Sequence, residues 1–251
     1  MSDFDRNVAA RGFGAARAAE IDAGLRAYML RIYNYMAAGV ALTGVVAWFT
    51  FNAAVVDTSA AQLVLSPFGQ TIYGGPLMIV LFVGTLGIVF FLSFRINKLQ
   101  ASTALTLFMA YAALLGLMLS SVMLTYTGTS IARTFFISAA SFGALSLYGY
   151  TTQRDLSPIG SFLIMGLFGL ILAMIVNMFL KSSGLDFAIS AIGVLIFAGL
   201  TAWDTQKIKE MYDANDDGTV AGRKSVMGAL TLYLDFINLF LFMLRFLGDR
   251  R

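Results

Sequence analysis

The fold is decided by the stretch Val226-Met-Gly-Ala-Leu-Thr-Leu-Tyr-Leu-Asp-Phe-Ile-Asn-Leu-Phe-Leu-Phe-Met-Leu244, which is long enough to cross a bilayer and carries one charge, at Asp235. An ionised carboxylate at the centre of a membrane-spanning helix costs about 3 kcal/mol on insertion scales. Acids in such helices therefore usually face a protein interior or a water-filled cavity. Asp235 is for this reason the first candidate for a functional residue.

The composition of the whole chain agrees with a membrane protein. Of 251 residues, 59% are hydrophobic and only 12% are charged, against about 25% charged in soluble domains. The chain contains no Cys and no His, which excludes disulfides, thiolate chemistry, His-based catalysis and the usual soft-metal ligands. The net charge of +3 comes from basic residues in short loops beside apolar segments, so we expect neither a nucleic-acid partner nor a cofactor.

Apolar segments of about 20 residues, the length that crosses a bilayer, recur along the chain. They predict an all-α integral membrane protein, a bundle of seven transmembrane helices in one domain spanning residues 31–251. Residues 1–30 are polar and rich in Arg and form the expected cytoplasmic tail. The predicted spans are Ile32 to Ala54, Leu77 to Phe94, Thr103 to Leu124, Ile131 to Tyr150, Ile159 to Leu180, Phe187 to Trp203 and Val226 to Leu247, joined by short connections.

The basic residues indicate the orientation. With the N-terminus in the cytoplasm, most of the 17 Lys and Arg residues lie on the cytoplasmic side, as the positive-inside rule requires. Arg250 and Arg251 follow the last span, so this arrangement places them outside the cytoplasm, against the rule. A re-entrant last segment would instead return them to the cytoplasm. We favour seven true spans with a cytoplasmic N-terminus. The short loops and the absence of Cys suit the inner membrane of a bacterium.

A second acid accompanies Asp235. All other acidic residues belong to tails or loops except Asp204, which closes the sixth span, and the short loop after it places both acids in the same half of the membrane. On the last helix Thr231, Asp235 and Asn238 share one face, and on the sixth Thr201 lies one turn before Asp204. The sequence therefore predicts a polar seam at which the two acids meet.

Two buried carboxyl groups in contact cannot both ionise cheaply, so they share a proton and titrate as a pair. Arg95 and Lys98, at the end of the second span, are cations that could balance this site, and Lys207 follows Asp204 by one turn. A simpler interpretation remains open. Asp204 then caps its helix at the interface and pairs with Lys207, while Asp235 joins two helices through one hydrogen bond.

One segment matches a calcium-binding motif only in part. The segment from Asp213 to Gly218 matches the start of an EF-hand loop. The position that needs a bidentate Glu in such a loop is Lys224. We therefore expect a solvated acidic turn here.

Two segments carry a family resemblance. The sequence from Gly228 to Gly248 resembles the signature of the Bax inhibitor-1 family, also called the transmembrane Bax inhibitor motif family, and Ala202-Trp-Asp-Thr-Gln-Lys207 resembles the turn after that family's sixth span. The resemblance implies a seven-helix bundle with the last helix at its centre. Bacterial members are thought to pass Ca²⁺ down its gradient in a pH-sensitive way. By resemblance, Asp204 and Asp235 form the proton-sensing pair and weak metal ligands along a Ca²⁺ pathway.

The family also has a basic latch to the equivalent of Asp204. In this sequence the latch corresponds to Arg95 or to Lys98, about one turn apart. We favour Arg95, because a guanidinium forms two geometrically fixed bonds to a carboxylate and an ammonium does not.

Three classes of function follow. The leading hypothesis is a pH-sensitive leak channel for calcium or another cation, gated by protonation of the paired aspartates. The alternative is a non-transport membrane regulator of proteases, quality control or stress survival, which acts on membrane-protein partners through helix contacts. An intramembrane aspartyl protease would present Tyr-Asp and Gly-x-Gly-Asp, whereas this chain has Trp203-Asp204 and Tyr233-Leu-Asp235. We therefore expect no enzyme.

Overall fold

The computed structural model describes residues 3–57 and 63–251, with side chains described for residues 21–57 and 63–251. Within these residues seven helices are long and apolar enough to cross a membrane, which confirms the all-α membrane fold. They are α1 (Asp3–Ala54), α3 (Pro76–Arg95), α4 (Ala101–Leu119), α6 (Gly128–Thr151), α7 (Ser157–Leu180), α8 (Ser183–Glu210) and α9 (Gly218–Leu247).

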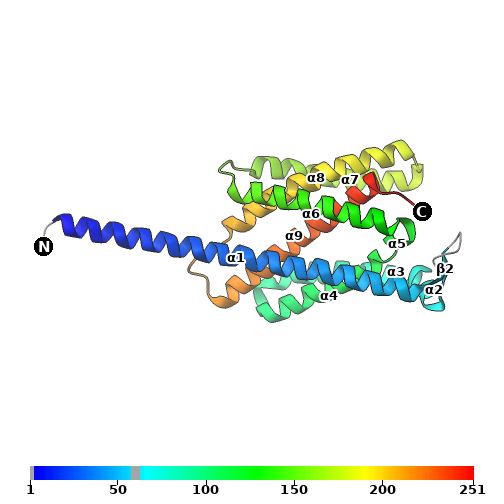
Figure 1. Cartoon of the computed structure of the whole chain (residues 1–251), viewed down its shortest axis with the longest axis horizontal. Helices are drawn as coiled ribbons and strands as arrows, with labels where there is room; N and C mark the ends of the chain where they lie inside the picture. The colour runs from blue at the N-terminus through cyan, green and yellow to red at the C-terminus, as the bar shows by residue number, and fades with distance from the viewer. Residues whose placement is uncertain (1–2, 58–62) are drawn as a thin grey trace.

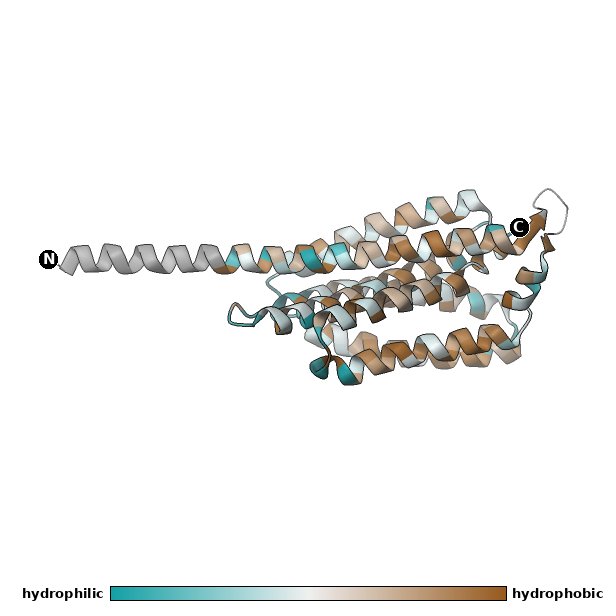
Figure 2. Cartoon of the chain, turned by 90° about the horizontal axis from the view of Figure 1, so that it is seen from below, coloured by the Kyte–Doolittle hydropathy of each residue, from teal (hydrophilic) through white to brown (hydrophobic). Residues whose placement is uncertain are grey.

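The surface of the bundle is apolar, as expected of a protein that is surrounded by lipid. Figure 2 shows hydrophobic residues along the lengths of the helices, and hydrophilic residues mainly near the helix ends and in the loops. Large side chains such as Phe94 and Phe179 are 81% and 76% exposed. Such exposure is expected where the surrounding medium is hydrocarbon, because lipid tails are as apolar as the side chains they contact.

Short elements fill the connections. Strands β1 (Val55–Asp57) and β2 (Val64–Leu65) pair antiparallel after α1. They are followed by α2 (Pro67–Tyr73), whose first turn is capped by the Ser66 hydroxyl. A 3₁₀ turn, η1 (Ile96–Lys98), follows α3, and α5 (Val122–Thr125) follows α4. The prediction of short connections is therefore wrong between the first two spans, where a hairpin and a helix intervene.

Helix α9 lies at the centre of the bundle, as the family resemblance implied. It packs against α1, α4, α6 and α8 and runs between them in Figure 1. Two thirds of its apolar span is buried (67%), compared with 11% for α7. Leu232, Tyr233 and Leu239 are completely buried. The prediction of a central last helix is thus confirmed.

The remaining helices form two groups around α9. Helices α3 and α4 pack together with α1 on one side, while α6 and α7 pack on α8 on the other. Helices α1 and α6 both contact α9, but their direct contact with each other is slight. Helix α1 is continuous from Asp3 to Ala54, so the segment assigned to an N-terminal tail continues into the first span without a break.

Candidate functional site

The two intramembrane acids meet at the interface of α8 and α9. Asp204 lies on α8 and Asp235 on α9, and their carboxyl groups lie side by side in the same cavity. Asp235 is only 5% exposed, and Asp204 is partly buried. An ionised carboxylate only accepts hydrogen bonds, so a bond between two carboxyl groups needs a proton on one of them. The two carboxyl groups are placed where one proton can be bonded by both, and the shared proton stays a prediction.

The pair lines a half-open cavity of about 550 Å³ between α7, α8 and α9. Asp204, Asp235, Thr231, Asn238 and Lys207 form its polar part. The rest of the wall is mainly apolar and includes side chains of α7. The acids thus lie in a hollow between helices and not on the outer surface of the bundle, a position in which intramembrane carboxylates are tolerated.

One oxygen of the pair is unsatisfied. The Oδ2 atom of Asp235 is buried and accepts no hydrogen bond from the described part of the chain. A buried acceptor left without a partner costs about 1–3 kcal/mol. The atom is closed off from solvent in this structure, so within the described residues the pair keeps one unsatisfied acceptor beside the cavity.

The predicted supporting residues divide into two sets. Thr231 and Asn238 line the cavity with Asp235, and the Asn238 amide donates to the Leu234 carbonyl at 2.8 Å. Thr201 is not among the cavity-lining residues. It is completely buried, and its hydroxyl donates to the Phe197 carbonyl within α8 at 2.7 Å. Thr201 therefore does not line the cavity, although it lies one turn before Asp204 on the same helix.

The cation beside the pair is Lys207. It lines the same cavity one turn beyond Asp204, with its Nζ atom 5.0 Å from the centroid of the Trp203 ring. Arg95 at the end of α3 and Lys98 at the end of η1 are exposed. Among the ion pairs of the described residues, neither is joined to Asp204. The latch stays a prediction, and this conformation does not engage it.

The packing of α3 explains where Arg95 lies. Helix α3 packs mainly on α4, and the turn after it is tied to the start of α9 by Arg223, whose guanidinium donates to the Asn97 carbonyl. This turn is therefore held by the start of α9.

The acidic loop between α8 and α9 uses its carboxylates locally. Asp213 accepts hydrogen bonds from Asn215, which hold the pKa of Asp213 below its ordinary value of 3.8. Asp217 caps α9, and Asp216 pairs with Lys224 at 2.5 Å. Across the described residues, no group of three or more His, Cys, Asp or Glu side chains is placed to hold a metal ion. The loop is an acidic turn in this structure.

The opposite end of α8 carries an ion-pair cluster that the sequence analysis did not identify. Asp186, in the first turn of α8, pairs with Arg245 of α9 and, at 3.6 Å, with Arg250. A carboxylate at a helix N-terminus and an arginine near a C-terminus both complement the helix dipoles. The cluster fastens α8 to α9 at the end away from the acid pair.

Comparisons with known proteins agree with the fold. The family model described as "Inhibitor of apoptosis-promoting Bax1" matches residues 25–251. An uncharacterized protein of Rickettsia prowazekii is 53% identical over 230 residues, 92% of each chain. The inner membrane protein YbhL of Escherichia coli is 48% identical over 231 residues, covering 91% of this chain and 94% of YbhL. A Caulobacter vibrioides protein is 44% identical over the full length of both chains. The chain therefore belongs to the Bax inhibitor-1 family of membrane proteins.

Proposed function

We propose that this protein is a pH-sensitive leak channel for Ca²⁺ or a similar cation, gated by protonation of Asp204 and Asp235. The observation that carries the proposal is the contact between these two carboxyl groups beside a cavity of about 550 Å³. A shared proton holds α8 and α9 together at this point, and its loss leaves two like charges in contact. Protonation thus biases the packing of the two helices.

The chemistry of the pair favours a hard cation as the transported ion. Calcium takes six to eight oxygen ligands, of which carboxylates are the commonest in proteins. Two carboxylates, with the Thr231 hydroxyl and the Asn238 amide oxygen in the same cavity, provide fewer oxygens than a resident calcium site needs. The set suits a cation that keeps part of its water shell while it passes.

We further propose that the protein resides in the bacterial inner membrane with its N-terminus in the cytoplasm, and that it is not an enzyme. The name of the YbhL relative supports the first part, and the distribution of basic residues supports the second. The lack of the sequence motifs of intramembrane aspartyl proteases supports the third. On this orientation the acid pair opens toward the cytoplasmic half of the membrane.

The test is Ca²⁺ flux into vesicles reconstituted with the purified protein, measured between pH 5 and pH 8. Wild type is expected to show a flux that depends on pH, and Asp235→Asn to lose that dependence. Asp213→Asn is the control, because it changes an exposed acid of the loop after α8 that lies outside the cavity. Normal flux with normal pH dependence in Asp235→Asn overturns the gating model. An absence of cation flux in wild type, with a membrane protein copurifying at equal amounts, favours the regulator instead.

A further inference from the structure

A second cavity lies in a groove between α1 and α6, on the flank of the bundle. These helices both pack on α9 and contact each other only slightly. The groove has a volume of about 600 Å³, and its lining includes Arg26, Leu30 and Tyr33 of α1 with Gly143, Ser146 and Tyr150 of α6. No residue lines both this groove and the acid cavity. Its volume is within the range of about 300–1,000 Å³ typical of ligand sites.

The walls of the groove are mainly apolar and open to the membrane. Leu30 on one wall is 52% exposed and Leu147 on the other is 61% exposed. These side chains lie within or beside the predicted apolar spans, where the surrounding medium is hydrocarbon. An aliphatic chain is the ligand chemistry that such walls accommodate.

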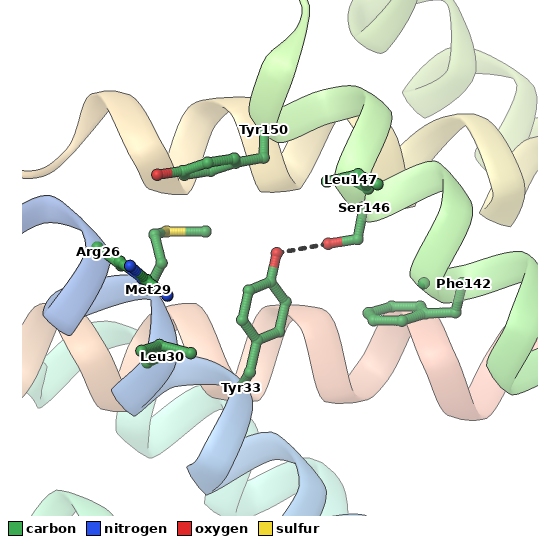
Figure 3. Close-up of a pocket in the computed structure, with 9 residues that line it drawn as sticks. Arg26, Met29, Leu30, Tyr33, Phe142, Ser146, Leu147 and Tyr150 are labelled. Carbon is green, nitrogen blue, oxygen red and sulfur yellow. Dashed lines mark hydrogen bonds between the residues drawn. The ribbon is translucent and has the colours of Figure 1, made fainter. Parts of the chain in front are cut away.

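One hydrogen bond crosses the groove and limits what can enter it. The Tyr33 hydroxyl of α1 bonds the Ser146 hydroxyl of α6 at 2.6 Å, as Figure 3 shows, and Ser146 in turn bonds Thr205 of α8 at 2.9 Å. A protein helix about 10 Å in diameter would have to break this link and leave buried hydroxyls without partners. An acyl chain is much thinner and can lie beside it. The crossing bond therefore favours a lipid over a helix of a partner or of a second copy.

A positive charge stands at one end of the groove. Arg26 lines the groove and is exposed. It precedes Ile32, where the first apolar span is predicted to begin, by about 9 Å of helix, which is headgroup depth. Lys209 of α8 is not among the lining residues, but it donates to the carbonyl of Tyr150, which lines the other wall, at 2.9 Å, and its Nζ atom is 5.4 Å from the Tyr150 ring. This end of the groove is thus complementary to an anionic headgroup.

We propose that the groove between α1 and α6 binds an anionic phospholipid, with an acyl chain along the apolar walls and the phosphate at Arg26. Asp22 lies one turn before Arg26 and is also exposed, so it offsets part of the charge. One arginine near a lipid surface is worth about fivefold in affinity. The site is independent of whether the acid pair conducts ions.

A groove-filling variant tests the apolar part. A Cβ atom built at Gly143 meets open space, and Gly143 lines the groove, so the Gly143→Leu side chain occupies part of the groove. Gly169→Leu is the matched control, because Gly169 of α7 is also exposed and has open space around it. Native mass spectrometry of the full-length protein with added phosphatidylglycerol counts the bound lipids. We expect Gly143→Leu to bind one lipid fewer than wild type, and Gly169→Leu to match wild type.

A charge variant tests the headgroup end. Arg26→Gln is compared with Arg31→Gln, which removes the same charge from an exposed position of α1 outside the groove. The probes are phosphatidylglycerol and phosphatidylcholine with identical chains. Arg26→Gln is expected to lower phosphatidylglycerol affinity about fivefold while phosphatidylcholine binding and the Arg31→Gln variant stay unchanged.

Four results overturn the proposal: full lipid binding in Gly143→Leu, equal effects of the two Arg variants, no preference of wild type for phosphatidylglycerol, and a dimer that Gly143→Leu abolishes. The last result would assign the groove to a second copy of the chain. The filling and charge variants are independent, so if one fails to fold, as judged by circular dichroism and elution volume, the other still decides.

Discussion

The contact between Asp204 and Asp235 makes a quantitative prediction for a double-mutant cycle. Each acid is replaced by Ala alone, and both are replaced together. Removing one partner leaves the other carboxyl group in the cavity without its hydrogen bond, and removing both leaves none behind. The double variant should therefore be less destabilised than the sum of the two single variants, whatever the sign of each single effect.

The expected departure from additivity comes from the kind of bond and from its burial. Hydrogen bonds that involve a charged group contribute about 1.5–3 kcal/mol, roughly twice the neutral value. Asp235 is 5% exposed, so water screens this contact little. We expect a coupling energy of about 1.5–3 kcal/mol at a pH where one shared proton leaves one charge on the pair.

The assay is equilibrium unfolding of the detergent-solubilised protein, followed by far-ultraviolet circular dichroism during titration with a denaturing detergent. The control cycle combines Asp204→Ala with Asp186→Ala. Both acids lie on α8, but Asp186 is in its first turn and pairs with Arg245. The helix rise separates these two acids by about 27 Å. Sites more than about 10 Å apart add within about 0.5 kcal/mol, so the control cycle should be additive.

The reasoning is refuted if the double variant of Asp204 and Asp235 equals the sum of its single variants within about 0.5 kcal/mol. The two acids would then act independently, and a shared proton would be excluded. Equal coupling in both cycles would also refute it, because the effect would then belong to α8 as a whole.

Two further predictions concern packing and the acidic loop. A Cβ atom at Gly193 of α8 would overlap the Phe242 ring of α9, so Gly193→Leu should destabilise the protein by about 1–3 kcal/mol in detergent unfolding, whereas Gly169→Leu should have a smaller effect. Hydrogen bonds from Asn215 lower the pKa of Asp213 from 3.8, so this carboxylate stabilises the loop above that pH and the contribution is lost as the pH falls through the lower folded-state pKa. Asp213→Ala should therefore speed hydrogen exchange of the Asn215 amide at pH 7; a pH 7 rate equal to that of wild type would contradict this.

The helices follow from the sequence because they depend on local composition, whereas the central place of α9 was expected only from the family resemblance. Apolar segments of sufficient length specify the spans, and the helix ends agree with the predicted spans within a few residues at most positions. The sixth and last spans extend further toward the cytoplasmic loop of the predicted topology, where α8 continues to Glu210 and α9 begins at Gly218. Their charged ends lie beyond the apolar segments, so hydropathy alone places the boundaries too early.

The contact between the acids was predictable for a related reason. An acid in an apolar span is costly to expose to lipid, and Asp235 had one candidate partner in the neighbouring span. The short connection between α8 and α9 then restricts where the two helices can meet. The location of Thr201 was not predictable in the same way, because residues three apart on a helix still point about 60° apart and only the packing of α6 and α7 decides which face meets the cavity.

The latch and the groove depend on contacts that have no local signal. Arg95 and Lys98 end a span in the sequence, but the packing of α3 on α4 decides how near they come to α8. Lys207 lies one turn from Asp204 on the same helix, so their proximity follows from the helix geometry and does not depend on how other helices pack. The groove arises because α1 and α6 both pack on α9 but contact each other only slightly. It therefore depends on the arrangement of three helices, which no single segment of the sequence specifies.

The acid cavity and the lipid groove share one rigid element. Asp204 on α8 lines the cavity, and Thr205, the next residue, bonds Ser146 in the wall of the groove. Consecutive residues point about 100° apart on a helix, so α8 presents one face to each space. A movement of α8 that separates Asp204 from Asp235 must also strain the bond between Thr205 and Ser146, unless α6 moves with it. Because Ser146 also bonds Tyr33, the hydroxyl chain gives α1 a direct mechanical connection to the helix that carries Asp204.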